Sequence, residues 1–241
     1  MKLTTNILGK STIFINDSCN YQCSYCTTTL KAKSAGLRVD NCKLFMQRIK
    51  KHVPRGWHFL ISGGGEPFLH PDFFYIIRSL IKSGYLISIN TNFSSPINDL
   101  KKFLKITKGK LICLISSLHL EFSNSDIFID KIIALKKSFP DFSNYCVVSV
   151  ALPGRLDQLK EIHLKFKKAG IKIELQPLRK ITGEHFKYSK EQQEKINQIN
   201  SKLKKIRKIK SLRVINGKNA DADINILYCL PLENRFVAFL Q

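Results

Sequence analysis

The sequence predicts an α/β fold, a partial, TIM-like (β/α)6 barrel of parallel strands with a short C-terminal extension of helix and strand. Short apolar runs alternate with amphipathic helical stretches along the chain, which is typical of repeated β–α units. The alternation stops after Pro177, which leaves six units, too few for the usual closed barrel of eight. We therefore expect a core over residues 1–180 and a C-terminal extension over residues 181–241.

The predicted strands are short, and most of their residues are apolar or β-branched. In chain order they cover residues 12–16, 58–62, 86–90, 111–116, 145–150 and 172–176. The predicted helices lie between them, at residues 43–51, 72–82, 97–105, 126–138 and 156–169. Asp72 is expected to cap a helix, and Gly84 and Gly170 are expected to end two of them, because glycine readily adopts the left-handed conformation.

The extension begins with a basic stretch, residues 190–210, that we expect to form a long helix. Its apolar residues fall on one stripe at helical spacing: Ile196, Ile199, Leu203 and Ile206. Such a stripe favours a helix that packs against its own domain, and it also fits a helix on a membrane surface or one facing RNA. Residues 212–241 suggest short strands without a repeat.

The composition is that of an ordinary folded domain, because 44% of the 241 residues are hydrophobic. No apolar run approaches the roughly 18 residues that a membrane span needs. Residues 1–10 lack the apolar core of a signal peptide. We therefore expect a cytoplasmic protein without a membrane span, whose seven cysteines are thiols or metal ligands and not disulfides.

Three cysteines stand within eight residues directly after the first predicted strand. Cys19, Cys23 and Cys26 have the spacing Cys-x3-Cys-x2-Cys, and thiolates so spaced can converge on one metal centre. Taken alone, the motif fits an iron–sulfur cluster and equally three of the four ligands of a zinc site.

A second motif ends the second predicted strand. Ser62-Gly63-Gly64-Gly65-Glu66-Pro67 lies where parallel α/β folds place their ligands. Glycines there let a ligand approach the backbone closely. A glycine run by itself also fits a tight turn, so its position one β–α unit after the cysteines is the informative feature.

Together the two motifs resemble those of the radical S-adenosylmethionine (radical SAM) superfamily. Tyr25 supplies the aromatic residue that this family has before its last cysteine, and residues 64–67 match its Gly-Gly-Glu-Pro motif, with Gly63 as an extra glycine. The resemblance spans residues 12–176 and is strongest to the SPASM/twitch-type subgroup, which modifies peptides and metabolites. The cysteine-rich extension of that subgroup is degenerate or truncated here, since Cys229 is the one cysteine in the C-terminal segment.

The resemblance implies that Cys19, Cys23 and Cys26 ligate three irons of a [4Fe–4S] cluster, and that the fourth iron binds S-adenosylmethionine. It also implies that reductive cleavage of S-adenosylmethionine gives a 5′-deoxyadenosyl radical, which abstracts hydrogen from a substrate. The other cofactor-binding residues that it implies lie in the two motifs and at strand ends: Tyr25, Gly64, Gly65, Glu66, Asn90, Ser116 and Gln176.

His119 follows the fourth predicted strand, at a position where peptide-modifying relatives often carry aspartate. An imidazole donates and accepts protons near neutral pH, so we expect His119 to be a catalytic residue that faces the reaction chamber, with Glu121 close enough to orient it. A structural, hydrogen-bonded histidine is the alternative. Phe93 is a second departure, because it stands where the family commonly has glycine.

The expected partners are a peptide or small-metabolite substrate and an electron donor such as flavodoxin or ferredoxin. An RNA-modifying enzyme is an alternative, suggested by the net charge of +22 and the basic helix. The excess charge is mostly lysine, which an AT-rich genome also favours, and residues 190–210 contain no aromatic residue on which bases would stack. A non-catalytic zinc-binding interaction protein is a third reading, and residues 64–67 argue against it.

Overall fold

A computed structural model describes residues 9–26, 39–62, 64–179, 184–200 and 236–237. The predictions for Leu203, Ile206 and Cys229 lie outside these residues. None of the helices within the described ranges is long and apolar enough to cross a membrane.

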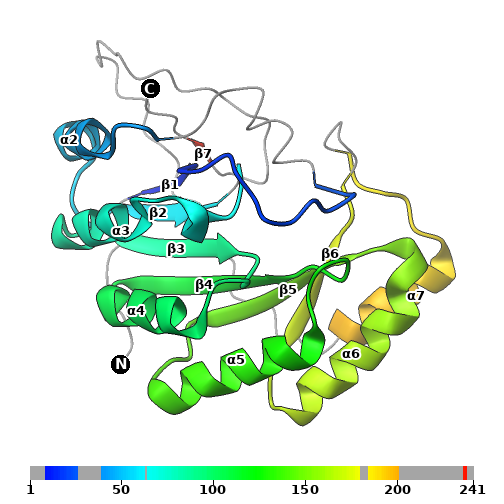
Figure 1. The fold of residues 1–241 in the computed structure, drawn as a ribbon. Helices are drawn as coiled ribbons and strands as arrows, with labels where there is room; N and C mark the ends of the chain where they lie inside the picture. The colour runs from blue at the N-terminus through cyan, green and yellow to red at the C-terminus, as the bar shows by residue number, and fades with distance from the viewer. Residues whose placement is uncertain (1–8, 27–38, 63, 180–183, 201–235, 238–241) are drawn as a thin grey trace.

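A single parallel sheet forms the centre of the molecule (Figure 1). Its six main strands are β1 (Lys10–Ile13), β2 (His58–Ile61), β3 (Leu86–Thr91), β4 (Leu111–Leu118), β5 (Tyr145–Ala151) and β6 (Ile173–Pro177). They lie in the order β6-β5-β4-β3-β2-β1, so that strands consecutive in the sequence are neighbours in the sheet. A short strand, β7 (Phe236–Val237), pairs with β1 in parallel orientation and adds part of the C-terminal segment to the sheet.

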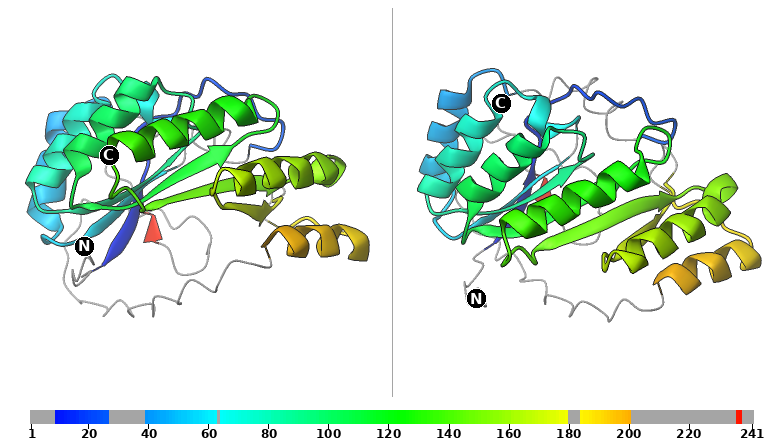
Figure 2. Two further views of the ribbon diagram at one scale, coloured as in Figure 1. Left: turned by 90° about the horizontal axis from the view of Figure 1, so that it is seen from below. Right: turned by 60° about the horizontal axis from the view of Figure 1, so that its bottom comes forward.

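The helices cover one face of this sheet, as the two views of Figure 2 show. They are α2 (Cys42–His52), α3 (Phe73–Lys82), α4 (Ile97–Thr107), α5 (Ser125–Ser138) and α6 (Leu156–Lys168), together with the short 3₁₀ helices η1 (Pro67–Leu69) and η2 (Pro153–Arg155). A helix therefore lies in each connection between consecutive strands from β1 to β6. The connection after β1, which contains α2, is described only in part. This arrangement confirms the predicted α/β fold with an open, partial barrel.

Alternation along the strands separates the two faces of the sheet. On β4, Leu114 and Leu118 belong to the hydrophobic core beneath the helices, whereas the intervening Ile115 and Ser117 are partly exposed on the opposite, open face. Leu60 is buried but lies outside that core cluster, which is expected for a side chain on the open face of β2. The strands thus support a helix-packed core on one side and present a second surface on the other.

The predicted element boundaries within the described residues hold within two residues, except that the first strand ends at Ile13, three residues before its predicted end. β1 pairs with β2 from Lys10 to Ile13, two residues before the predicted start. Lys10 and Ser11 lack the apolar character used to find the strand, and their place in it is fixed by backbone pairing to β2.

The basic helix packs against its own domain, as predicted. Its described part, α7 (Lys190–Asn200), lies against α6 and β6 (Figure 1) and buries Ile196 and Ile199. Lys195 forms ion pairs with Asp157 of α6 at 2.9 Å and with Glu191 at 3.2 Å.

Phe93, which follows β3, has an unusual backbone. Its φ is 60°, the one positive value for a non-glycine residue in the described chain. The ring is 2% exposed and packs on Phe128 at a centroid distance of 4.8 Å. Lys131 donates its Nζ hydrogens to the carbonyls of Phe93, Ser94 and Ser95 at 3.0, 3.2 and 2.9 Å, which fixes the turn.

Two opposing effects meet at Phe93. The left-handed conformation costs a non-glycine residue roughly 1–2 kcal/mol, whereas losing a buried phenylalanine ring costs roughly 3–5 kcal/mol. We predict that both Phe93→Ala and Phe93→Gly lower the free energy of unfolding, and that the glycine variant is the more stable of the two by about 1 kcal/mol. Urea denaturation measures this difference. An alanine variant as stable as the glycine variant, or more stable, would show that the backbone of residue 93 is not strained.

Candidate metal centre

The three motif cysteines lie on the segment that leaves β1 at the C-terminal edge of the sheet. Residues 14–26, here called the cysteine loop, contain neither helix nor strand. The thiols of Cys19, Cys23 and Cys26 are partly exposed. Because the loop has no backbone ladder of its own, contacts from neighbouring strand ends must hold its thiols in place.

The glycine motif holds one side of the cysteine loop by close backbone contact. A Cβ atom added to Gly65 would lie 1.9 Å from the carbonyl oxygen of Ser18, so a larger residue does not fit there. The same Ser18 oxygen accepts hydrogen bonds from the Glu66 N–H at 2.9 Å and from Asn16 Nδ2 at 2.9 Å. Gly64 has a positive φ of 76°, which explains a second glycine of the motif. Gly65 thus packs directly against the cysteine loop, and the predicted binding of the cofactor by Gly64 and Gly65 stays a prediction.

Glu66 points inward and links the ends of β2 and β3. Its carboxylate accepts hydrogen bonds from Thr91 Oγ1 at 2.7 Å, from Asn92 N at 2.7 Å and from Phe68 N at 3.3 Å. Burial raises the pKa of this carboxyl to about 7, against the opposing effect of those hydrogen bonds. In this structure the Glu66 side chain fixes the site's framework, and its predicted contact with the cofactor stays a prediction.

Two asparagines lie at the end of β3, Asn90 within the strand and Asn92 directly after it. Asn92 Nδ2 donates to Asn20 Oδ1 at 2.8 Å and lies 3.8 Å from Cys19 Sγ. Asn90 donates to Ser62 Oγ at the end of β2. Asn90 Oδ1 is the one buried side-chain oxygen or nitrogen without a hydrogen-bond partner among the described residues. A buried acceptor of this kind suits a ligand that carries an amino or hydroxyl group.

The segment after β4 holds the other side of the cysteine loop. His119 Nδ1 lies 3.3 Å from Cys23 Sγ and 3.0 Å from the Tyr25 hydroxyl. Glu121 accepts hydrogen bonds from the backbone N–H and the hydroxyl of Ser24. Glu121 thus holds the cysteine loop directly, and its expected role in orienting the His119 imidazole stays a prediction.

Aromatic rings complete this side of the site. Tyr21 stacks on Phe122 with centroids 5.0 Å apart, and Tyr25 stacks on His119 at 6.0 Å. Burial lowers the pKa of His119 and outweighs the opposing effect of Glu121, so the neutral imidazole is favoured. Residues of the cysteine loop and of the segment after β4 thus form one packed unit, although about 95 residues separate them in the chain.

Two of the motif thiols, those of Cys19 and Cys23, are harder to ionise in this setting than a free thiol. Burial raises the pKa of Cys19, and it raises the pKa of Cys23 to about 11, with further contributions from the neighbouring cysteines. A coordinated metal reverses this balance, because a metal-bound thiol loses its proton. The donor set therefore suits a metal centre and not three isolated thiolates.

Two predicted cofactor residues are not brought to the cysteine loop. Ser116 is 1% exposed and shares the helix-facing register of Leu114 and Leu118, and its neighbour Ser117 lies on the open face instead. Gln176 is exposed near the end of β6, which is an edge strand of the sheet. For these two residues cofactor binding remains a prediction.

A second group of potential metal ligands lies away from the cysteine loop. Among the described residues, Cys42, His70 and Asp72 have ligand atoms that all lie within 4.8 Å of one another.

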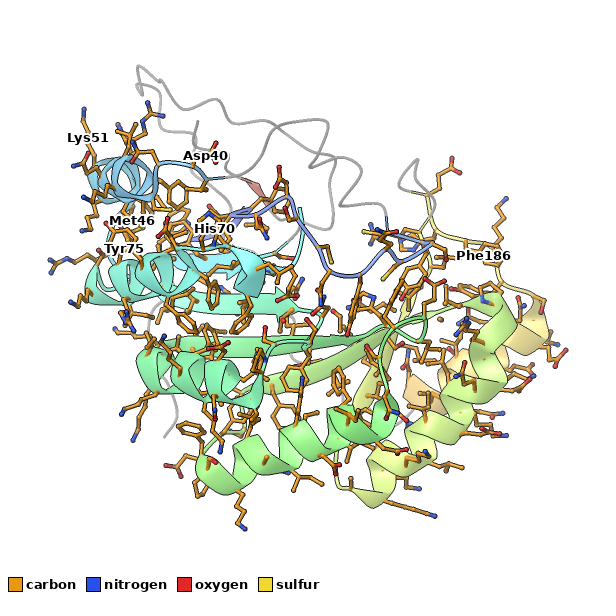
Figure 3. The ribbon with its side chains drawn as sticks, in the orientation of Figure 1. Asp40, Met46, Lys51, His70, Tyr75 and Phe186 are labelled. Atoms are coloured by element: carbon orange, nitrogen blue, oxygen red, sulfur yellow. The ribbon has the colours of Figure 1, made fainter. Side chains whose placement is uncertain are left out.

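The Cys42–His70–Asp72 group is a structural junction between α2 and α3. His70 Nε2 lies 2.9 Å from the Val39 carbonyl and its Nδ1 accepts from Asp72 N at 3.0 Å, so both ring nitrogens are used. Cys42 lies 3.5 Å from Asp72 Oδ2. Figure 3 shows His70 near Asp40, where the chain enters α2.

A comparison with protein families decides the class of the centre. The model of the radical SAM superfamily matches residues 13–187, which is well over half of the chain. The chain belongs to the radical SAM superfamily. It is an enzyme, and its cofactors are those of the family, a [4Fe–4S] cluster and S-adenosylmethionine.

Curated relatives match part of the chain. It is 32% identical over 124 residues to the 7-carboxy-7-deazaguanine synthase of Methanospirillum hungatei, which covers 51% of this chain and 49% of the relative. It is 30% identical over 98 residues to the synthase of the same name from Aquifex aeolicus, covering 40% and 43%. The chain thus matches about half the length of these relatives or less.

Solved structures share the fold. The structure titled native anSMEcpe with bound AdoMet and Cp18Cys peptide has a TM-score of 0.53 at 19% identity, covering 78% of this chain and 57% of that one. Streptococcus suis SuiB bound to precursor peptide SuiA has a TM-score of 0.55 at 16% identity, covering 82% and 47%.

Motif reasoning missed the polar residues of the cysteine loop through which the loop is held. Asn16 and Ser18 precede the cysteine motif and Asn20 and Ser24 are variable positions within it, yet each bonds to a strand end or to the segment beyond one. Their signal in the sequence is weak: short polar side chains that follow an apolar strand and flank cysteines.

The contact between Gly65 and Ser18 leads to a sharp prediction. Gly65→Ala should displace the cysteine loop and lower iron incorporation severalfold, because the added Cβ overlaps backbone that cannot rotate away. Gly154→Ala is the matched control, since a Cβ there meets nothing within 4 Å. Iron per chain after anaerobic reconstitution is the measurement. Equal iron content in the two variants would contradict this role for Gly65.

Proposed function

We propose that this enzyme uses S-adenosylmethionine to abstract a hydrogen atom from a small-molecule substrate bound over the open face of the sheet. The observation that carries the proposal is the placement of three partly exposed thiols on a loop that is held by residues at the C-terminal strand ends, where Asn90 of β3 also has an unpartnered buried acceptor. In parallel α/β folds this edge is where ligands bind.

The loop thiols of Cys19, Cys23 and Cys26 would hold the cluster. When bound, the cluster supplies the electron that cleaves S-adenosylmethionine to methionine and a 5′-deoxyadenosyl radical, which takes hydrogen from a substrate C–H bond. Asn90 Oδ1 offers an acceptor to a polar group of the bound cofactor. Gly64 and Gly65 keep the backbone close to the loop, and Tyr25 closes its side toward β4. His119 lies at the cluster side of the chamber.

The partial sequence identity of 30–32% with 7-carboxy-7-deazaguanine synthases supports a small metabolite as the substrate. A peptide is the second candidate, supported by the likeness of the fold to SuiB, a structure solved with a precursor peptide. RNA is less favoured, because the described part of the basic helix buries its apolar stripe and pairs Lys195 with two carboxylates of the same chain.

Two further roles complete the proposal. An external one-electron donor such as flavodoxin or ferredoxin would reduce the cluster. Residues 1–180 would form the catalytic core and residues 181–241 an extension that adds α7 and β7 to its two edges.

We predict that the anaerobically reconstituted protein binds about four irons and four sulfides per chain, as one [4Fe–4S] cluster requires. Changing Cys19, Cys23 or Cys26 to Ala should abolish reductant-dependent formation of 5′-deoxyadenosine. Cys113→Ala is the matched control, because Cys113 is a partly buried thiol in the middle of β4, away from the strand end. Chromatographic assay of 5′-deoxyadenosine tests both. Continued formation by the triple cysteine variant would sink the proposal.

A further inference from the structure

The His119 side chain is held in place from several directions. Its backbone carbonyl accepts from the N–H groups of Phe122 at 2.9 Å and Ser123 at 2.7 Å, which makes a tight turn directly after β4. Its ring lies nearly parallel to that of Tyr25, with an interplanar angle of 16°, and edge-on to that of Tyr21 at 79°. An imidazole packed in this way points one nitrogen at a fixed target.

That target is a cysteine ligand. His119 Nδ1 lies 3.3 Å from Cys23 Sγ, which is within hydrogen-bond range for sulfur. A metal-bound thiolate has no proton and can only accept, so the contact is a hydrogen bond when Nδ1 carries the hydrogen. The Tyr25 hydroxyl, 3.0 Å from the same nitrogen, also hydrogen-bonds Cys23 and can donate to it in turn.

We propose that His119 is a positioning residue that donates a hydrogen bond from Nδ1 to the Cys23 thiolate and thereby raises the reduction potential of the cluster. Reduction adds one negative charge to the centre, and a donor aimed at a ligand sulfur stabilises the more negative state. Hydrogen bonds to ionised acceptors are stronger than those between neutral groups, so one donor is enough to matter. This inference rests on the proposed function, in which Cys23 holds the cluster.

The inference assigns His119 a role other than proton transfer to the substrate. A proton shuttle through Nδ1 would need that nitrogen to be open toward the substrate, whereas here Nδ1 is already occupied by two groups of the cysteine loop. The neighbouring Glu121 accepts hydrogen bonds from Ser24 and adds negative charge beside Cys23. Its charge should therefore lower the reduction potential of the cluster, whereas the His119 hydrogen bond raises it. The two residues therefore predict shifts of opposite sign.

The test is a redox titration of the reconstituted enzyme, followed by electron paramagnetic resonance. His119→Phe keeps an aromatic ring over Tyr25 and removes the donor. It should make reduction about tenfold less favourable, a fall of about 59 mV in the midpoint potential for a one-electron couple. His119→Asn places an amide near the position of Nδ1 and should stay within about threefold of the parent enzyme. Glu121→Gln should raise the potential.

Each outcome of the titration supports or contradicts the proposed hydrogen bond from His119 to Cys23. A His119→Phe potential equal to that of the parent, or an equal fall in His119→Asn, would show that no donor to Cys23 sets the potential. If His119→Phe loses its cluster, a His119→Asn enzyme that keeps both cluster and potential supports the hydrogen bond, and loss of the cluster in both variants overturns it. A parent enzyme that binds no cluster would instead contradict the proposed function.

Discussion

The site depends on how the cysteine loop is held, because that loop carries the metal ligands and has no regular secondary structure. Two sets of contacts confine it. On one side, the Ser18 carbonyl accepts from Glu66 N and Asn16 Nδ2 while Gly65 packs directly against it. On the other side, His119 and Glu121 reach Cys23 and Ser24. Apart from the Asn16 bond, which lies within the loop, one set comes from the segment that follows β2 and the other from the segment that follows β4, so the sheet's register sets the position of the thiols.

This arrangement explains why the ends of the strands are polar while their centres are apolar. Glu66 is buried, and its carboxylate accepts hydrogen bonds from Thr91 and Asn92, which connects the ends of the second and third strands. Asn92 continues the chain of contacts to Asn20 beside Cys19. Leaving one member of such a buried network without a hydrogen bond costs free energy, and this cost favours a single geometry of the network. The free acceptor on Asn90 stands out against this background as a place for a ligand.

The order of strands and helices could be predicted from the sequence because each apolar run is short and each helix has one apolar face. The three cysteines and the glycine motif could be predicted because their spacing is specific to one family.

The direction in which each strand side chain points was harder to predict. Ser116 falls on the helix-packed face and Ser117 on the open one, and a one-residue difference in strand register decides between them. The pairing of Glu121 with Ser24 could not be predicted, because it joins residues 97 apart through a turn whose shape is not encoded in a motif. Phe93 was identified as a departure, yet its support by Lys131 comes from tertiary contact alone.

The central claim is that three loop thiols hold a [4Fe–4S] cluster and leave one of its irons for S-adenosylmethionine. Mössbauer spectroscopy of enzyme reconstituted with iron-57 tests it most directly, with and without S-adenosylmethionine. Three cysteine ligands for four irons predict that one quarter of the iron signal changes when the cofactor is added and that the rest stays as it was. A spectrum that does not respond to the cofactor, or one in which all the iron changes alike, would contradict the account.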